Sequence, residues 1–303
     1  MPASSPIIVL DSGLGGLTVA KAIRRAMPRE DVLYFGDTAR LPYGSKTADT
    51  VSTYVKQIVA YLRPYDPKHV VLACNTATAL AMPALRTTFP DLSISGVIEP
   101  GAKAAVIAAG ARPVPTIAVI ATEATIRSRA YDRAIHRRRH HARLLLKATP
   151  LLVPIIEEGR GGDDPLVRLA LKQYLTPLVT GHKPDVLVLG CTHYPILKDV
   201  IRRMLGPSVS VIDSAEQCAD DVARRLRAAG SLRPEPISPE SAGAVGDLRC
   251  FVTDDPQRFG KLASRFLGFE IAEPTWVSPD ELYATKLPVA APAEPAIPIS
   301  IPA

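Results

Sequence analysis

The sequence predicts an α/β protein of two doubly wound parallel-sheet domains, related by pseudo-two-fold symmetry, with the active site in the cleft between them. Short runs of Val, Ile and Leu alternate with segments of helical length, a pattern typical of parallel sheets buried on both faces. Two of these runs lead into a cysteine, Cys74 and Cys191. A length of 303 residues also suits two domains of ordinary size.

The first series of elements starts at the amino terminus and alternates apolar strands with helices. In chain order it comprises the strand Ile7–Leu10, the turn Asp11–Gly16, the helix Thr18–Met27, the strand Val32–Phe35, the helix Thr47–Leu62 and the strand Val70–Ala73. The second series, which begins near residue 100, comprises the strand Thr116–Thr122, the helix Ile126–Ile135, the strand Val186–Leu189, the helix Tyr194–Met204 and the strand Val209–Ile212. Both series carry a strand followed by cysteine and polar residues, which suggests a diverged internal duplication.

The chain then continues with a predicted helix at Ala215–Ala229, a loop at Ser231–Gly246 and a last β/α unit at Arg249–Leu267. We assign residues 1–99 plus 214–270 to the first domain and residues 100–213 to the second. Residues 271–303 are rich in proline, which disfavours helices and central strands. We therefore expect this tail to be disordered and dispensable for chemistry.

Composition limits the class of protein. With 47% hydrophobic and 22% charged residues the chain is ordinary globular material. Part of its net charge of +6 lies in His136–Arg143, where no aromatic residues are interleaved, so we expect a solvated basic face and no nucleic-acid partner.

The arrangement of cysteines and apolar runs indicates a compartment. None of the four cysteines forms a C-x-x-C pair, which argues against a disulfide framework and a zinc site. The run Ile7–Leu10 is too short for a signal peptide or a membrane span. We therefore expect a cytoplasmic protein without membrane contact, whose thiols stay reduced.

Cys74 and Cys191 are the first candidate functional residues. Ligands of open α/β sheets bind at the carboxyl ends of the strands, and both cysteines follow such ends. A lone buried cysteine more often fills core space, but two at matching positions, each followed by polar residues, favour a shared site. Two thiols on opposite sides of a substrate could move a proton from one face of a carbon to the other. Cys218 and Cys250 lack this context, and we interpret them as packing residues.

The turn after the first strand offers further candidates. Asp11, Ser12 and the glycines that follow could bring backbone amides close to a carboxylate, or Asp11 could simply cap a helix. A dinucleotide-binding fingerprint fails because Thr18 stands where the third glycine is required, and no phosphate-binding loop follows.

His193 stands two residues after Cys191, where it could orient the thiol or act as a ligand-facing acid. Glu157 or Glu158 could support it, although a helix-start role for these carboxylates is equally compatible with the sequence.

Several motifs together resemble the glutamate racemases, over about residues 6 to 268. They are Asp11–Leu17, Tyr34–Gly44, Ala73–Ala77, Val97–Gly101, Ala121–Thr125 and Gly190–Pro195. The resemblance implies interconversion of L- and D-glutamate for peptidoglycan synthesis by a homodimer. It also implies that Cys74 and Cys191 act as the two acid/base residues, assisted by Asp11 and His193, and that the substrate is bound by Asp11, Ser12, Tyr43, Gly44, Asn75, Thr76, Thr192 and His193.

No lysine stands in a recognisable pyridoxal phosphate context, so we expect neither a cofactor nor a metal. Positioning and electrostatics would then stabilise the carbanion, and the amides after each cysteine would favour a thiolate. Three alternatives stay open. They are an aspartate racemase of the same superfamily, in which Glu would replace His193, a cysteine hydrolase using Cys191 and His193, and a non-catalytic binding protein.

Overall fold

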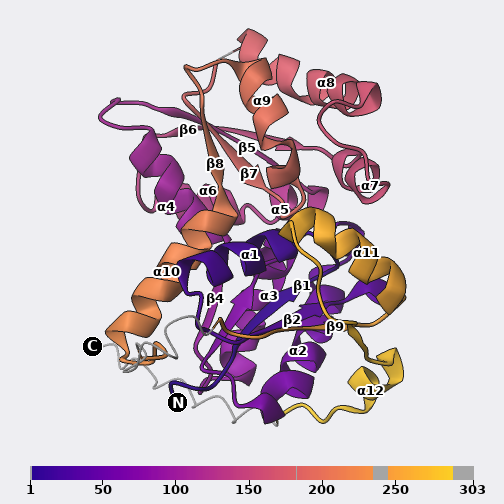
Figure 1. The fold of residues 1–303 in the computed structure, drawn as a ribbon. Coiled ribbons are helices and arrows are strands. Elements are labelled where there is room, and N and C mark those ends of the chain that lie inside the picture. The colour runs from indigo at the N-terminus through magenta and orange to yellow at the C-terminus, as the bar shows by residue number, and fades with distance from the viewer. Residues whose placement is uncertain (1, 182, 235–244, 289–303) are drawn as a thin grey trace, which may run out of the picture.

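The computed structural model describes residues 2–181, 183–234 and 245–288. It has two sheets, one in each half of the molecule, and every strand pair in them is parallel (Figure 1). The predicted fold class, two parallel-sheet α/β domains, is confirmed.

The strands are β1 (Ile7–Asp11), β2 (Val32–Gly36), β3 (His69–Leu72), β4 (Ile94–Gly96), β5 (Thr116–Ala121), β6 (Arg143–Ala148), β7 (Val186–Gly190), β8 (Ser210–Asp213), β9 (Leu248–Val252) and β10 (Thr275–Trp276). The helices are α1 (Leu17–Ala26), α2 (Ala48–Leu62), α3 (Asn75–Thr88), α4 (Ile98–Ala108), α5 (Glu123–Arg127), α6 (Ala130–His136), α7 (Leu152–Glu157), α8 (Pro165–Gly181), α9 (Lys198–Leu205), α10 (Ser214–Ala228), α11 (Pro256–Leu267) and α12 (Pro279–Ala284). Short 3₁₀ turns are η1 (Thr38–Arg40), η2 (Tyr43–Ser45), η3 (Arg63–Tyr65) and η4 (Tyr194–Leu197).

The first sheet has the strand order β10-β9-β2-β1-β3-β4 and is covered by helices on both faces. Alternate residues of β1 point to opposite faces. Val9 belongs to a core shared with α1, α10 and α11, whereas Leu10 belongs to a core shared with α2, α3 and α12. This two-sided burial explains why β1 is apolar at successive positions instead of alternating with polar residues.

The second sheet has the order β6-β5-β7-β8 and repeats the central part of the first. In the first sheet β1 lies between β2 and β3, and in the second sheet β5 lies between β6 and β7. In each case the last-named strand precedes a cysteine. The positions that follow β3 and β7, Cys74 and Cys191, are therefore equivalent. Helices α8 and α9 pack with one face of this sheet, and α4 and α6 with the other.

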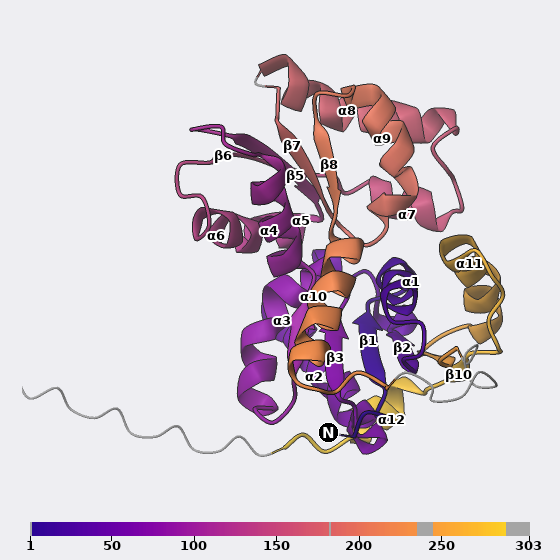
Figure 2. The same cartoon turned by 60° about the vertical axis from the view of Figure 1, so that its left-hand side comes forward.

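Helix α10 connects the two halves. It begins directly after β8 and runs along the first domain beside α1 (Figures 1 and 2). Its buried side chains, including Cys218 and Val222, join a core that also contains residues of both sheets. The division of the chain at residues 99/100 and 213/214 stays a proposal. Strands β1 to β9 each lie in the sheet that this division assigns to them, whereas β10 extends the first sheet from the region assigned to the tail.

Two predictions about secondary structure were wrong. The tail from residue 271 contains β10, which extends the first sheet, and α12, whose Leu282 is fully buried. Proline is compatible with α12 because Pro279 occupies its first turn, where no backbone N–H is needed, and the two residues of β10 include no proline. The predicted helix Ile126–Ile135 is divided into α5 and α6, because Arg129 adopts a left-handed backbone conformation with φ of 54°. Residues 289–303 and 235–244, the rest of the tail and most of the predicted loop, lie outside the described residues.

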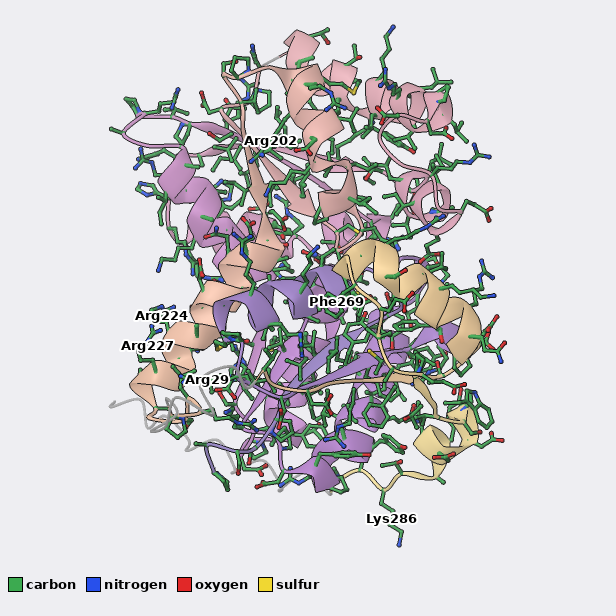
Figure 3. All side chains as sticks on the ribbon, viewed as in Figure 1. Arg29, Arg202, Arg224, Arg227, Phe269 and Lys286 are labelled. Carbon is green, nitrogen blue, oxygen red and sulfur yellow. The ribbon has the colours of Figure 1, made fainter. Side chains whose placement is uncertain are left out.

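The basic segment His136–Arg143 is largely exposed, as expected, and within it Arg137 and Arg138 pair with Glu99 at the surface. Basic residues also lie on separate elements in both halves, such as Arg202 on α9 and Arg224 on α10 (Figure 3). Within the described ranges, no helix is both long and apolar enough to cross a membrane.

Candidate active site

A cavity of about 290 Å³ lies where the carboxyl ends of the two sheets meet. Strands β1, β3, β5, β6 and β7 each contribute residues that follow their last position. The lining residues are Ser12, Leu41, Pro42, Tyr43, Gly44, Ser45, Cys74, Asn75, Thr76, Thr122, Glu123, Thr149, Pro150, Val153, Pro154, Glu157, Cys191, Thr192 and His193. The cavity therefore contains both cysteines and every predicted site residue except Asp11.

Cys74 caps the amino terminus of α3. Its sulfur accepts the Ala77 backbone N–H at 3.5 Å, and its thiol donates to Ser12 Oγ at 3.7 Å. Burial, reinforced by the nearby Asp11 charge, raises the pKa of Cys74 to about 12, although the two hydrogen bonds act in the opposite direction. Cys74 is therefore a protonated thiol at neutral pH, ready to act as an acid.

Cys191 lies beside a charged pair. Its sulfur is 3.7 Å from His193 Nδ1, and His193 Nε2 is 3.0 Å from Glu157 Oε1. Burial alone would lower the pKa of His193, but its hydrogen bonds to Cys191 and Glu157, and their charges, raise it to about 10. His193 is therefore an imidazolium at neutral pH and can stabilise negative charge on the Cys191 sulfur. Of the two carboxylates considered, Glu157 is the one in contact, whereas Glu158 is exposed.

Asp11 does not reach the cavity wall, which departs from its predicted contact with substrate. Its exposed fraction is 0%, and its carboxylate accepts the Gly13 N–H at 3.0 Å and the Thr192 hydroxyl at 3.4 Å. Burial raises the pKa of Asp11 from its ordinary value, against the nearby His193 charge. The strand end that carries Asp11 is buried, so its carboxylate lies behind the cavity and contacts Thr192, which lines it.

The remaining predicted residues line the cavity from both domains. The Tyr43 hydroxyl donates to Asp37, which is held by Arg40. Thr76 Oγ1 is 3.0 Å from Thr122 Oγ1, so a polar contact joins the two domains at the cavity. A Cβ on Gly44 would lie 2.9 Å from Thr122 Cβ, which explains why the loop needs glycine there.

Thr122 and Thr149 line the cavity although neither was predicted as a site residue. Thr122 follows β5 as Ser12 follows β1, and Thr149 follows β6. The signal for both is the same, a polar residue directly after an apolar strand. Thr149 was missed because β6 starts inside the basic segment, at Arg143, and is only half-buried along its length.

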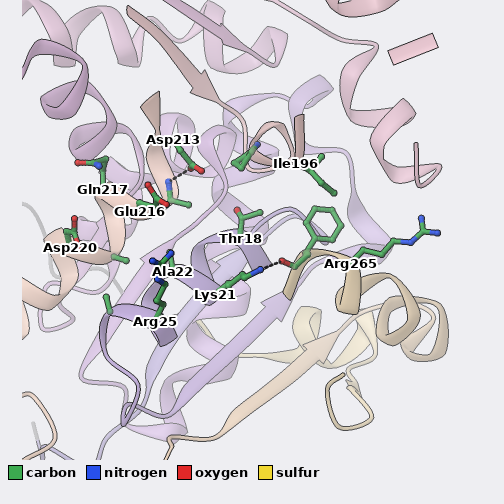
Figure 4. Close-up of a pocket in the computed structure, with 15 residues that line it drawn as sticks. Thr18, Lys21, Ala22, Arg25, Ile196, Asp213, Glu216, Gln217, Asp220 and Arg265 are labelled. Carbon is green, nitrogen blue, oxygen red and sulfur yellow. Dashed lines mark hydrogen bonds between the residues drawn. The ribbon is translucent and has the colours of Figure 1, made fainter. Parts of the chain in front are cut away.

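A larger cavity, of about 690 Å³, opens between α1, α10 and α11 (Figure 4). Lys21 and Arg25 lie on its α1 side and Glu216 and Asp220 on its α10 side. Its lining contains neither cysteine nor histidine, so it is separate from the pair formed by Cys74 and Cys191. In the part of the chain that the structure describes, no three His, Cys, Asp or Glu side chains gather as a metal site.

The paired sheets and the cavity with two cysteines define the class to which the chain belongs. Residues 15–221 match the model of the Asp/Glu/Hydantoin racemase family. The glutamate racemase of Koribacter versatilis (strain Ellin345) is 43% identical over 288 residues, which cover 89% of this chain and 97% of that protein.

Two solved structures extend the comparison. Glutamate racemase isoform RacE1 from Bacillus anthracis superposes with a TM-score of 0.83 and 37% identity, covering 91% of this chain and 98% of that one. The Francisella tularensis glutamate racemase, solved in complex with D-glutamate, gives 0.81 and 33%, with the same coverage. The chain therefore belongs to the Asp/Glu/Hydantoin racemase family and, within it, to the glutamate racemases.

Proposed function

We propose that the protein interconverts L- and D-glutamate without a cofactor, using Cys74 and Cys191 as two acid/base residues. The observation that carries this proposal is the presence of both thiols in one cavity, at equivalent strand ends of the two domains. Racemisation requires that a proton leaves one face of Cα and that another arrives on the opposite face. One thiolate and one thiol meet that requirement, and they exchange roles when the direction of the reaction reverses.

The surroundings of the two sulfurs differ, which supports different roles for them. Cys74 is held as a thiol by burial and by Asp11, whereas Cys191 lies beside the His193 imidazolium. In one direction, the Cys191 thiolate removes the Cα proton and the Cys74 thiol supplies its own to the opposite face. In the other direction the Cys74 sulfur is the base, and its charge is stabilised by the Ala77 N–H and the amino terminus of α3.

Stabilisation of the carbanion falls to hydrogen-bond donors that are already in place. Cys74 precedes α3, so the first backbone N–H groups of that helix lie next to the cavity. Ser12, Asn75, Thr76 and Thr192 add polar side chains around it. These donors suit the two carboxylates of glutamate, and the Francisella relative with bound D-glutamate supports that substrate.

The other candidates are less well supported. A cysteine hydrolase would use Cys191 with His193 and Glu157, which do form a hydrogen-bonded series, but it gives Cys74 no role in the same cavity. An aspartate racemase is expected to carry Glu in place of His193. We also propose, from the resemblance, that the enzyme supplies D-glutamate for peptidoglycan synthesis in the cytoplasm as a homodimer. The four cysteines, all of them free, suit a reducing compartment.

A racemisation assay tests the function. We expect the optical activity of L-glutamate to decay to zero in the presence of the purified protein, measured by circular dichroism without added cofactor. D-glutamate should give the mirror-image decay. The proposal would be overturned by a requirement for pyridoxal phosphate or by turnover of aspartate alone.

Removing the Glu157 charge is expected to change the pH dependence. His193 is protonated below a pKa of about 10, so activity that needs the imidazolium is complete at neutral pH and is lost as the pH rises through that value. Glu157→Gln removes the negative charge that raises the pKa of His193. The fall of kcat/KM at alkaline pH should therefore occur about 1–3 pH units lower. Glu158→Gln is the matched control and should leave the pH of this fall unchanged. A fall at the same pH in Glu157→Gln would show that the imidazolium is not needed.

A further inference from the structure

The amide of Asn75 has a buried nitrogen without a partner. Asn75 lines the cavity with an exposed fraction of 2%. Among the described residues, its Nδ2 is one of three buried side-chain atoms with no hydrogen-bond partner, and the other two, on Glu30 and Arg40, lie outside the cavity lining. An unpaired buried donor is costly, so its presence in the cavity points to a ligand acceptor.

The other end of the same amide is held from the opposite domain. The hydroxyl of Tyr131, on α6, donates to Asn75 Oδ1 at 2.8 Å. Tyr131 itself does not line the cavity. It is buried, with Ser214, the first residue of α10, nearby. The hydrogen bond from Tyr131 to Asn75 therefore runs from the second domain to the cavity wall.

The position of the Tyr131 ring is set by its neighbours. A Cβ on Gly190 would lie 3.1 Å from the Tyr131 ring, and a Cβ on Gly101 would lie 3.5 Å from its hydroxyl oxygen. These glycines, on β7 and α4, leave the space that the ring fills. Helix α6 packs against α4 in the upper half of the molecule (Figure 2), and the hydroxyl reaches from there to Asn75 in the other half.

Hydrogen-bond chemistry then decides which way the Asn75 amide faces. Burial raises the pKa of Tyr131 above its ordinary value, so the hydroxyl keeps its single proton. That proton is donated to the Asn75 amide oxygen, which can only accept. The amide NH₂ group must then face away from Tyr131, where its hydrogens are available to the cavity.

We propose that Tyr131 is a positioning residue of the racemase: it holds the Asn75 amide so that its N–H groups donate to a substrate carboxylate. The inference rests on the proposed function, because it names how that substrate is held. Without the Tyr131 hydroxyl the amide can rotate, and its oxygen can face the carboxylate and repel it. Tyr131 also makes the carboxylate site depend on contact between the two domains, although it touches no substrate.

Tyr131→Phe tests the proposal, since it removes one oxygen and keeps the ring. We expect KM for both enantiomers to rise about tenfold, the effect of one lost hydrogen bond to a charged group, while kcat changes less than threefold. The equilibrium constant of racemisation is one, so kcat/KM must fall by the same factor in both directions. Asn75→Ala should raise KM at least as much, and adding Tyr131→Phe to it should change KM less than twofold.

Tyr174→Phe is the matched control, because Tyr174 is a buried tyrosine of the same domain whose hydroxyl accepts the Leu151 N–H. Its KM and kcat should stay within twofold of the wild type. Tyr131→Phe at wild-type KM, or losses that multiply in the double variant, would overturn the inference while leaving the racemase function intact. A wild type inactive on glutamate would instead refute the function. If Tyr131→Phe does not fold, the double variant Asn75→Ala/Tyr131→Phe is used instead, because it no longer contains an Asn75 Oδ1 without a partner. Its KM is compared with that of Asn75→Ala.

Discussion

Replacing Cys74 or Cys191 with serine is expected to reduce racemisation about 10²–10⁴-fold in both directions. Every turnover needs one sulfur as base and the other as acid, and a serine hydroxyl is a much weaker acid than a thiol. Elimination of HCl from a chloro-substituted glutamate needs a single base. Each variant should therefore still release chloride from one enantiomer, and the two variants should prefer opposite enantiomers.

The design has an internal control. Cys218→Ser changes a buried cysteine of α10 that does not line the cavity, and it should racemise at a rate close to the wild type. Chloride release by each variant from each enantiomer, followed with an ion-selective electrode, gives the preferences. If Cys74→Ser and Cys191→Ser prefer the same enantiomer, the two thiols do not serve opposite faces of the substrate.

Replacing His193 with asparagine is expected to lower kcat by about 10²-fold or more. The imidazolium lies 3.7 Å from the Cys191 sulfur, and its charge stabilises the thiolate that removes a proton. The kcat loss should be larger in the direction that uses Cys191 as base. Because the equilibrium constant is one, kcat/KM must fall equally in both directions, so the asymmetry has to appear in kcat and KM separately.

His69→Asn is the control for this variant. His69 is buried between Ser93 and Ser95 in the first domain, and burial lowers its pKa to about 4, so it carries no charge at neutral pH. Its replacement should leave kcat within about threefold of the wild type. Progress curves from L- and D-glutamate give kcat and KM for each direction. A loss in His193→Asn that appears only in KM, equally from both sides, would reduce His193 to a residue of the turn.

Much of the site was predictable because it follows a local rule. Cys74 and Cys191 are each preceded by an apolar strand of a few residues, and the edge of a parallel sheet brings such positions together. The same rule covers Ser12 and, had it been applied to β5, Thr122. The prediction of disorder failed for residues 271–288 because proline content says little about the first turn of a helix or about an edge strand such as β10.

What the sequence by itself determined is therefore the alternation of parallel strands and helices in two series, the two cysteines at equivalent strand ends, and the resemblance to the glutamate racemases. Only the tertiary structure decided that Asp11 is buried behind the cavity, that Glu157 and not Glu158 contacts His193, and that Tyr131 holds Asn75. The physical reason is the range of the interactions. Strand ends are encoded by neighbouring residues, whereas the Tyr131–Asn75 contact spans 56 positions and exists only when α6 and α3 are brought together by the packing of two domains.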